Sequence, residues 1–224
     1  MRHWQIALTA IAALAVITQA RAADQPHNVV LFVPDGLRAK MVTPETAPTM
    51  AAIRSQGVDF QNSHSLFPTF TMPNASALAT GHWLGDTGVF SNTIYTGYNV
   101  PVSGAGVTPF LESDAVLGRV DQHAGGNFLD ETALLSAARR SGLSTAAVGK
   151  VGPILIFDHI DRAGAPTIVV DDATGSANGI PLAPEVSDAM KQAAIPFAAP
   201  TRGANGVAGN MSKPGTTVAN VAQQ

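Results

Sequence analysis

The chain has 224 residues, with 13 basic and 16 acidic side chains and a formal net charge of −3. This length is sufficient for one domain with a sizeable core, and the acidic balance excludes a surface that wraps a polyanion such as nucleic acid. Cysteine is absent, so core packing or a bound metal must stabilise the fold without disulfides.

The first 22 residues have the pattern of a secretory signal peptide. Arg2 and His3 precede an apolar run from Ile6 to Ile17, and Ala20-Arg21-Ala22 is a small-x-small cleavage pattern. The run is too short and too rich in alanine for a transmembrane span, although an uncleaved anchor stays open. Removal of residues 1–22 leaves 11 basic and 16 acidic side chains, a net charge of about −5. We expect a secreted or periplasmic protein with no membrane segment after signal removal.

A strand that ends in an aspartate is predicted at the start of the mature chain. Residues 28–33 are a continuous apolar, β-branched run, and Pro34-Asp35-Gly36 follows. Such a run is typical of a strand buried on both faces of a parallel sheet. Ligands gather outside the carboxyl ends of strands in open α/β sheets, which makes Asp35 a candidate site residue. Aspartate is also an ordinary turn former.

A helix and a second strand are predicted next. Residues 46–57 contain a capping threonine, a proline near the first turn and a terminal Gly57, which together indicate a short helix. Residues 58–64 alternate weakly between apolar and polar side chains, and this alternation predicts a strand.

The segment 66–81 places one hydroxyl residue, Thr71, between two prolines and ahead of an alanine-rich helix that stops at Gly81. Asn74 stands at the expected N-cap. We expect Thr71 just ahead of a helix N-terminus, where free backbone N–H groups and the helix dipole favour an anion such as a phosphoryl group. A capped surface helix after a turn is the alternative interpretation.

Residues 93–128 are rich in turns and show little periodicity, which indicates a cap-like or substrate-facing insertion. His82 and His123 are isolated histidines in loop-like sequence, where solvated side chains are more common than metal ligands. Neither is assigned to a site.

A helix at 130–142 and a strand at 143–148 are predicted next, with the helix as a crossover between parallel strands. Asp158 and His159 follow an apolar strand predicted at 153–157. They are possible metal ligands, although neighbouring side chains on a strand point apart.

The predicted elements end with a strand at 167–172 that carries acidic residues at its end. Residues 196–224 are rich in Gly, Ala and Asn, and they predict a flexible loop or a truncated continuation.

Taken together, these motifs resemble the type I phosphodiesterase/nucleotide pyrophosphatase family of the alkaline phosphatase superfamily. The resemblance rests on the strand-end Asp35-Gly36, on Ala47-Pro48-Thr49-Met50 and on Phe67-Pro68-Thr69-Phe70-Thr71-Met72-Pro73-Asn74. It covers residues 28–92 well and 93–195 loosely. A sulfatase is disfavoured, because that group uses Cys or Ser in a C/S-x-P-x-R context.

The resemblance implies an α/β fold with three layers and a mostly parallel central sheet, incomplete in this chain, with residues 23–195 as the N-terminal part of a catalytic domain. It implies hydrolysis of phosphodiester or pyrophosphate bonds in small-molecule or nucleotide substrates, with two zinc ions. Asp35 would bind metal, Thr71 would be the metal-activated nucleophile, and Asn74 would donate to a phosphoryl oxygen. We expect Asp35 and Thr71 to approach each other at the carboxyl edge of the sheet.

The sequence departs from the family in its later metal ligands. Family members carry an Asp-His pair next to Gly, whereas the nearest match here is Asp158-His159-Ile160. Because catalytic zinc usually has three protein ligands, we expect a fragment that lacks part of the metal site and hydrolyses diesters weakly or not at all. The alternative is an inactive exported remnant that binds anions or a partner.

Overall fold

The computed structural model describes residues 28–102 and 104–198. The predicted signal peptide at 1–22 and most of the predicted loop at 196–224 lie outside these residues. Among the helices described, none combines the length and the apolar character that a membrane span requires.

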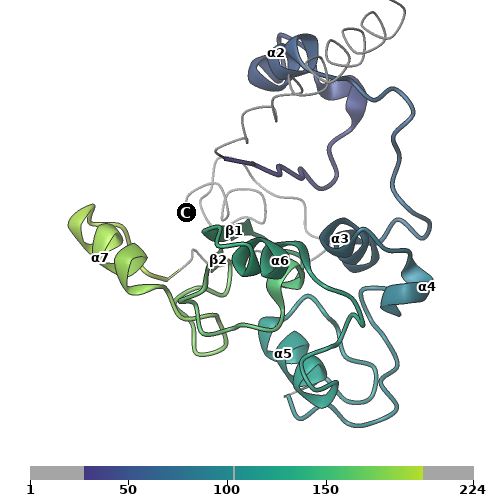
Figure 1. Ribbon diagram of the computed structural model, residues 1–224, viewed down its shortest axis with the longest axis vertical. Helices are drawn as coiled ribbons and strands as arrows, with labels where there is room; N and C mark the ends of the chain where they lie inside the picture. Colours follow the sequence, from purple (N-terminus) through teal and green to yellow (C-terminus); the bar gives the residue numbers. More distant parts are fainter. Residues whose placement is uncertain (1–27, 103, 199–224) are drawn as a thin grey trace, which may run out of the picture. The chain divides into compact units, whose positions relative to one another are not determined.

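The chain divides into two compact units, Met1–Asp59 and Phe60–Gln224. Helices are the main regular secondary structure among the described residues of both units, and the second unit also holds a small parallel sheet (Figure 1). The catalytic domain predicted at 23–195 would include parts of both units, and its bounds remain a prediction.

The first unit contains the 3₁₀ helix η1 (Ala39–Met41) and the helix α2 (Pro48–Gln56). The helix predicted at 46–57 is thus confirmed. Its first residue is a proline, whose missing N–H costs nothing at that position. It ends at Gly57, whose N–H donates to the Ile53 carbonyl over 2.9 Å.

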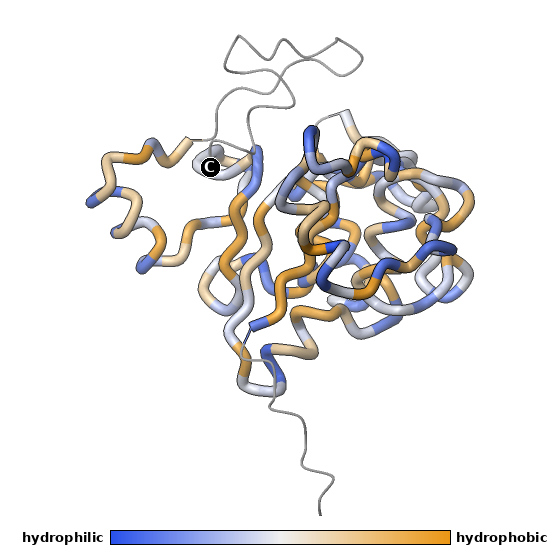
Figure 2. The backbone as a smooth tube through the Cα atoms, turned by 90° about the horizontal axis from the view of Figure 1, so that it is seen from above, coloured by the Kyte–Doolittle hydropathy of each residue, from blue (hydrophilic) through white to orange (hydrophobic). Residues whose placement is uncertain are grey.

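The buried strand predicted at 28–33 is wrong. These residues have no regular secondary structure, and their side chains are exposed, with Val30 at 86% and Phe32 at 70%. A strand exists only through hydrogen bonds to a neighbour, and no strand is found among the described residues of the first unit. Figure 2 colours the backbone by hydropathy, with residues 29–33 toward the orange, hydrophobic end of the scale.

The strand predicted at 58–64 is also wrong, because these residues form a turn and irregular chain. The alternation of apolar and polar side chains there was weak, and no strand in the described part of the chain pairs with this segment.

The second unit contains five α-helices, one 3₁₀ helix and two strands among its described residues. In chain order they are α3 (Thr71–Thr80), α4 (Leu84–Thr87), α5 (Asp114–His123), α6 (Leu134–Arg140), β1 (Thr145–Gly149), η2 (Leu155–Asp158), β2 (Thr167–Asp171) and α7 (Pro184–Gln192).

The two strands pair in parallel, with Thr145 opposite Thr167 at one end and Gly149 opposite Asp171 at the other. The strands predicted at 143–148 and 167–172 are therefore confirmed, and mixed helices with a parallel sheet are compatible with the predicted α/β class. The predicted central sheet is reduced to two strands in the described residues.

Two connections differ from the prediction. The helix expected at 130–142 is found as the shorter α6, which precedes β1, and the link from β1 to β2 contains η2 instead. The strand predicted at 153–157 is wrong, because η2 occupies most of it. Leu155 and Ile156 are fully buried, so the apolar run correctly indicated burial but not the backbone conformation.

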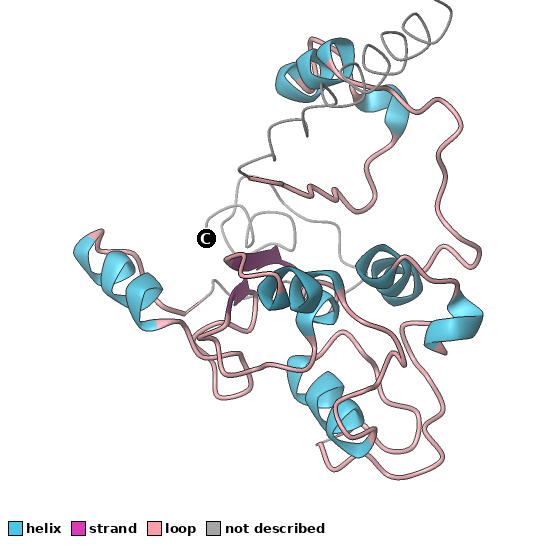
Figure 3. Ribbon diagram, in the orientation of Figure 1, coloured by secondary structure: helices cyan, strands magenta, loops and turns pink. Residues whose placement is uncertain are grey.

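Helix α5 was not predicted. Loops dominate the chain between α4 and α5 (Figure 3), but the expected irregular region at 93–128 ends in this regular helix. The Ser113 side chain caps it by accepting from the Val116 N–H. Gly118 lies inside the helix because a Cβ there would meet the Arg162 Nε at 2.7 Å. Glycine weakens a helix, and the tertiary contact that requires it at this position cannot be seen in the sequence.

The core of the second unit lies where α3, α5, η2 and β2 meet. Its apolar side chains come from residues as far apart as Met72 and Ile180. The largest fully buried apolar side chains are Met72, Leu111, Leu117, Leu129, Leu155 and Ile156. This core fixes α3, whose N-terminus carries the candidate nucleophile.

Candidate functional site

Thr71 is the first residue of α3 rather than the residue ahead of it. Phe70 is the N-cap in an extended conformation, and Gly81 ends the helix in the left-handed conformation with a φ of 75°. Pro73 fits within the first turn, where its missing N–H is not needed for an intrahelical bond. The helix can therefore begin before the second proline, which puts the threonine hydroxyl in the first turn.

Asn74 is not the N-cap that the sequence predicted, because it lies inside the first turn. Its side-chain carbonyl accepts from the Leu66 N–H at 2.8 Å, and its Nδ2 donates to the Phe70 carbonyl at 2.9 Å. Nδ2 also lies 3.3 Å from the Pro68 carbonyl. These bonds fold the preceding loop back onto α3, so in this structure Asn74 holds the segment that leads into Thr71.

Asn92 is a second asparagine at this helix end, and sequence reasoning missed it. Its Oδ1 accepts from the Met72 N–H at 2.9 Å, and its backbone carbonyl accepts from the Leu111 N–H at 2.8 Å. The first of these bonds orients the side-chain amide beside the start of α3. Nothing in the turn-rich sequence around Asn92 distinguishes it from an ordinary loop residue.

Asp35 lies in the turn that the sequence predicted after residue 34. Gly36 has a φ of 77°, and the Leu37 N–H donates to the Pro34 carbonyl across the turn. Asp35 belongs to the first unit and Thr71 to the second. Their predicted approach stays a prediction.

Asp158 and His159 do not act as a pair. Asp158 accepts from the Arg139 Nε at 2.8 Å and from its Nη2 at 2.7 Å, and it also accepts from the Thr167 hydroxyl. Such a bidentate ion pair satisfies a buried carboxylate. The arrangement gives Asp158 a structural partner, and it argues against the possible metal role of this residue.

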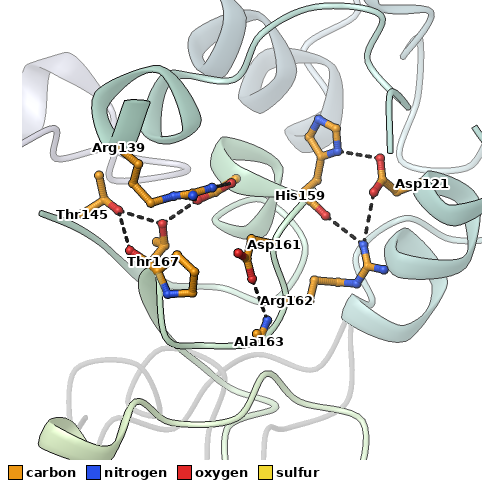
Figure 4. Close-up of polar contacts among 10 residues, drawn as sticks. Asp121, Arg139, Thr145, His159, Asp161, Arg162, Ala163 and Thr167 are labelled. Carbon is orange, nitrogen blue, oxygen red and sulfur yellow. Dashed lines mark hydrogen bonds and ion pairs between the residues drawn. The ribbon is translucent and has the colours of Figure 1, made fainter. Parts of the chain in front are cut away.

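His159 points to a different element. Its Nδ1 lies 2.8 Å from the Asp121 Oδ1, and the Arg162 Nη1 donates to Asp121 and to the His159 carbonyl (Figure 4). Burial acts to raise the pKa of Asp121, but the His159 hydrogen bond and the nearby positive charges outweigh burial and lower it. The cluster fastens α5 to the chain after η2.

The two unassigned histidines also have protein partners. The His82 Nδ1 lies 3.1 Å from the Glu131 Oε1, and the His123 ring stacks on Tyr98 with 3.5 Å between ring centroids. These contacts agree with leaving both histidines out of the site.

A metal centre is not assembled by the described residues. They contain no group of three or more His, Cys, Asp or Glu side chains that could hold a metal ion. Catalytic zinc in proteins usually has three protein ligands, and no such set is found within residues 28–102 and 104–198.

Residues 29–195 match the family model described as type I phosphodiesterase / nucleotide pyrophosphatase. The chain therefore belongs to this family, whose members are generally metal-dependent hydrolases of phosphodiester and pyrophosphate bonds. No curated protein and no solved structure gave a match.

Proposed function

We propose that this chain carries the nucleophile segment of a hydrolase that cleaves phosphodiester or pyrophosphate bonds in small molecules or nucleotides, with Thr71 as the nucleophile. The observation that supports it is the position of Thr71 as the first residue of α3. In the first turn the Met72 N–H is bonded to Asn92 and Pro73 has no N–H, so the attraction proposed for an anion is that of the helix dipole, which gives this end a partial positive charge. A phosphoryl group bound there would lie next to the threonine hydroxyl.

The proposed reaction has two displacements. The Thr71 Oγ1 forms a bond to phosphorus while the bond from phosphorus to the leaving oxygen breaks. The threonine proton leaves to solvent, and the leaving group departs with the electron pair. Water then attacks phosphorus, and the bond from phosphorus to the Thr71 Oγ1 breaks with its electron pair going to Oγ1. Oγ1 takes up a proton to restore the hydroxyl, the water loses its proton to solvent, and the phosphomonoester leaves. Because a threonine hydroxyl is a weak nucleophile at neutral pH, this scheme needs activation beyond that offered by the helix end alone.

Asn74 and Asn92 are the proposed donors to the phosphoryl oxygens. The amide of Asn74 donates to backbone carbonyls here, so it would have to release one of them to reach a substrate. The amide of Asn92 is already oriented by the bond from Met72 to its Oδ1, which leaves the Nδ2 hydrogens as donors near Thr71. A hydrogen-bond donor that is already oriented before the reaction begins can stabilise the negative charge that develops on a phosphoryl oxygen in the transition state.

Asp35 is proposed to bind metal, as the resemblance implies, but the described residues supply too few ligands to hold zinc. No step is therefore assigned to a metal. We propose that the 224-residue chain lacks the remaining ligands and therefore turns over diesters weakly or not at all.

The experiment compares bis(p-nitrophenyl) phosphate hydrolysis by the 224-residue chain and by a version extended with the C-terminal part of a family member, both with and without zinc. In the extended protein, Thr71→Ala should abolish most turnover, and Asn74→Ala or Asn92→Ala should each cost on the order of 10²-fold. Thr80→Ala, at the other end of the same helix, is the matched control and should keep activity. Zinc-dependent turnover by the short chain at the level of the extended one would show that the proposed ligand deficit is wrong.

The alternative function is binding without turnover, and the shortage of metal ligands in the described residues favours it. An inactive exported remnant would use the start of α3 to bind an anion or a partner. Titration calorimetry with inorganic phosphate separates the two. Phosphate binding that Thr71→Ala weakens, combined with no hydrolysis by either length of chain, would favour the remnant.

We further propose that the protein is exported, because Arg2 and His3 precede an apolar run and a small-x-small cleavage pattern. Export predicts a mature protein that begins at Ala23. Mass measurement of the protein recovered from the periplasm or the culture medium tests this.

A further inference from the structure

Two buried carboxyl groups lie where α5 begins and β2 ends. Asp114 is the first residue of α5 and is 3% exposed, and Asp171 is the last residue of β2 and is fully buried. The Oδ1 of Asp114 accepts from the Gly152 N–H at 3.3 Å, whereas that of Asp171 accepts from the Ala173 N–H at 2.9 Å. The Oδ2 atoms of both residues are buried without a hydrogen-bond partner in the described structure.

The two carboxyl groups lie close together, because the Gly152 N–H binds Asp114 while the neighbouring Val151 N–H binds Asp172, the residue after Asp171. If both were ionised, each would offer only acceptors, and two negative charges would repel in a site without solvent. One proton shared between them supplies the missing donor and removes one of the charges. The same proton accounts for both unpartnered oxygens.

The surrounding charges do not neutralise this pair. Asp172 adds a third acidic group and accepts from the Val151 N–H at 2.7 Å. The nearby cation, Lys150, is paired with Glu112. The start of α5 favours an ionised Asp114 through the helix dipole, but this effect is small beside the burial of two like charges.

A bound cation is the other way to neutralise two carboxylates. A divalent ion in a protein takes six or more oxygen ligands, and the described residues contain no group of three acidic or histidine side chains suited to a metal. A proton needs only the two oxygens that are present.

We propose that Asp114 and Asp171 share one proton, and that this carboxyl–carboxylate pair is a pH-sensitive latch that fastens the start of α5 to the carboxyl end of β2. The proposal concerns the fold of the second unit and does not depend on the hydrolase function.

The direction of the pH dependence follows from the pKa of the pair. Burial first, and then the hydrogen bond and charge of Asp171, raise the pKa of Asp114 from 3.8 to about 8. The folded chain therefore holds a proton that the unfolded chain releases above about pH 4. The stabilisation is complete below that pH and is lost as the pH rises to about 8. Over this window the folding equilibrium constant should fall by up to tenfold per pH unit on account of this group.

The test is urea unfolding of the full chain, followed by circular dichroism between pH 5 and pH 9. The Asp114→Asn side chain can donate to Asp171 without a charge, so its unfolding midpoint should vary little with pH and should exceed that of the natural chain at pH 9. Asp130→Asn, at an exposed acid bonded to Asn127, is the matched control and should keep the natural pH slope. If the urea midpoint of Asp114→Asn changes with pH as steeply as that of the natural chain, the proposal is wrong.

A second measurement uses the natural chain, so it does not depend on whether a variant folds. In the natural chain labelled with ¹³C at the aspartate carboxyl carbons, one aspartate signal should titrate near pH 8. If every aspartate signal titrates below pH 6, the proposal is wrong. It is equally wrong if millimolar Mg²⁺ or Ca²⁺ raises the urea midpoint at pH 7 and Asp114→Asn removes that gain, because a cation would then occupy the pair.

Discussion

The two units use their apolar side chains in opposite ways. In the first unit the apolar run at 28–33 is exposed, and Val42 is the one large apolar side chain buried among the described residues. In the second unit, apolar residues from α3, α5, η2 and β2 surround Leu117 and Ile156, which are fully buried. An apolar run thus indicates that burial is favourable, but only long-range partners decide whether it occurs. The stability of the described structure should reside in the second unit.

The largest effect is expected from breaking the ion pair that ties α6 to η2. Arg139→Ala leaves the buried Asp158 carboxylate with only its hydroxyl donor, which should cost about 3–5 kcal/mol of unfolding free energy. The neighbouring Arg140 is exposed, so Arg140→Ala should change stability by less than about 0.5 kcal/mol. Urea unfolding of both variants tests this, and equal losses would show that the pair does not stabilise the second unit.

A slightly smaller loss is expected from the core. Leu117→Ala removes a fully buried side chain of α5 and should cost about 2–5 kcal/mol, including the cavity that remains. Ile53→Ala on α2, where the side chain is 66% exposed, should cost little. If chemical denaturation shows that Ile53→Ala is the more damaging of the two, the contrast between the units is wrong.

Acid should loosen the second unit through Asp121. Because the pKa of this carboxyl group is lowered in the folded chain, its stabilisation is present above the ordinary aspartate pKa and is lost as the pH falls through the lowered value. Asp121→Asn should reduce this acid sensitivity and lower stability at pH 7. Asp188→Asn, at an exposed pair with Lys191, is the control and should follow the natural chain. Acid titrations followed by circular dichroism would contradict the assignment if Asp121→Asn and the natural chain lost structure in parallel.

The smallest effect belongs to the exposed run of the first unit. Val30 is 86% exposed, so Val30→Ser should change the unfolding free energy by no more than about 0.5 kcal/mol. A loss of 2 kcal/mol or more, which is about the cost of exposing a buried aliphatic side chain, would mean that this run is buried in solution. That result would remove the difference between the two units.

Local signals predicted the elements that depend on local physics. Pro48 and Gly57 marked α2, Gly81 marked the end of α3, and short apolar runs marked β1 and β2. The strand expected at 28–33 failed because a strand needs a neighbour, and no local pattern names that neighbour. Helix α5 was missed because its internal Gly118 is explained only by the approach of Arg162.

In the candidate site, too, the features set by local sequence were predicted and those set by long-range contacts were not. The sequence placed Thr71 next to a helix start, because prolines and a terminal glycine constrain that segment locally. It could not show that Asn92 would orient beside Met72, a contact across 20 positions, or that Asp158 would pair with Arg139 across 19. The role given to Asn74 as N-cap failed because helical geometry tolerates Pro73 in the first turn, which lets the helix begin earlier.

The most direct test of the central claim is to trap the covalent intermediate on Thr71. The extended protein would be mixed with bis(p-nitrophenyl) phosphate, quenched in acid within one turnover and digested for peptide mass spectrometry. The account predicts a p-nitrophenyl phosphoryl group on Thr71, absent from Thr71→Ala and present in the Thr80→Ala control. An adduct on another residue, or undiminished turnover by Thr71→Ala, would contradict it.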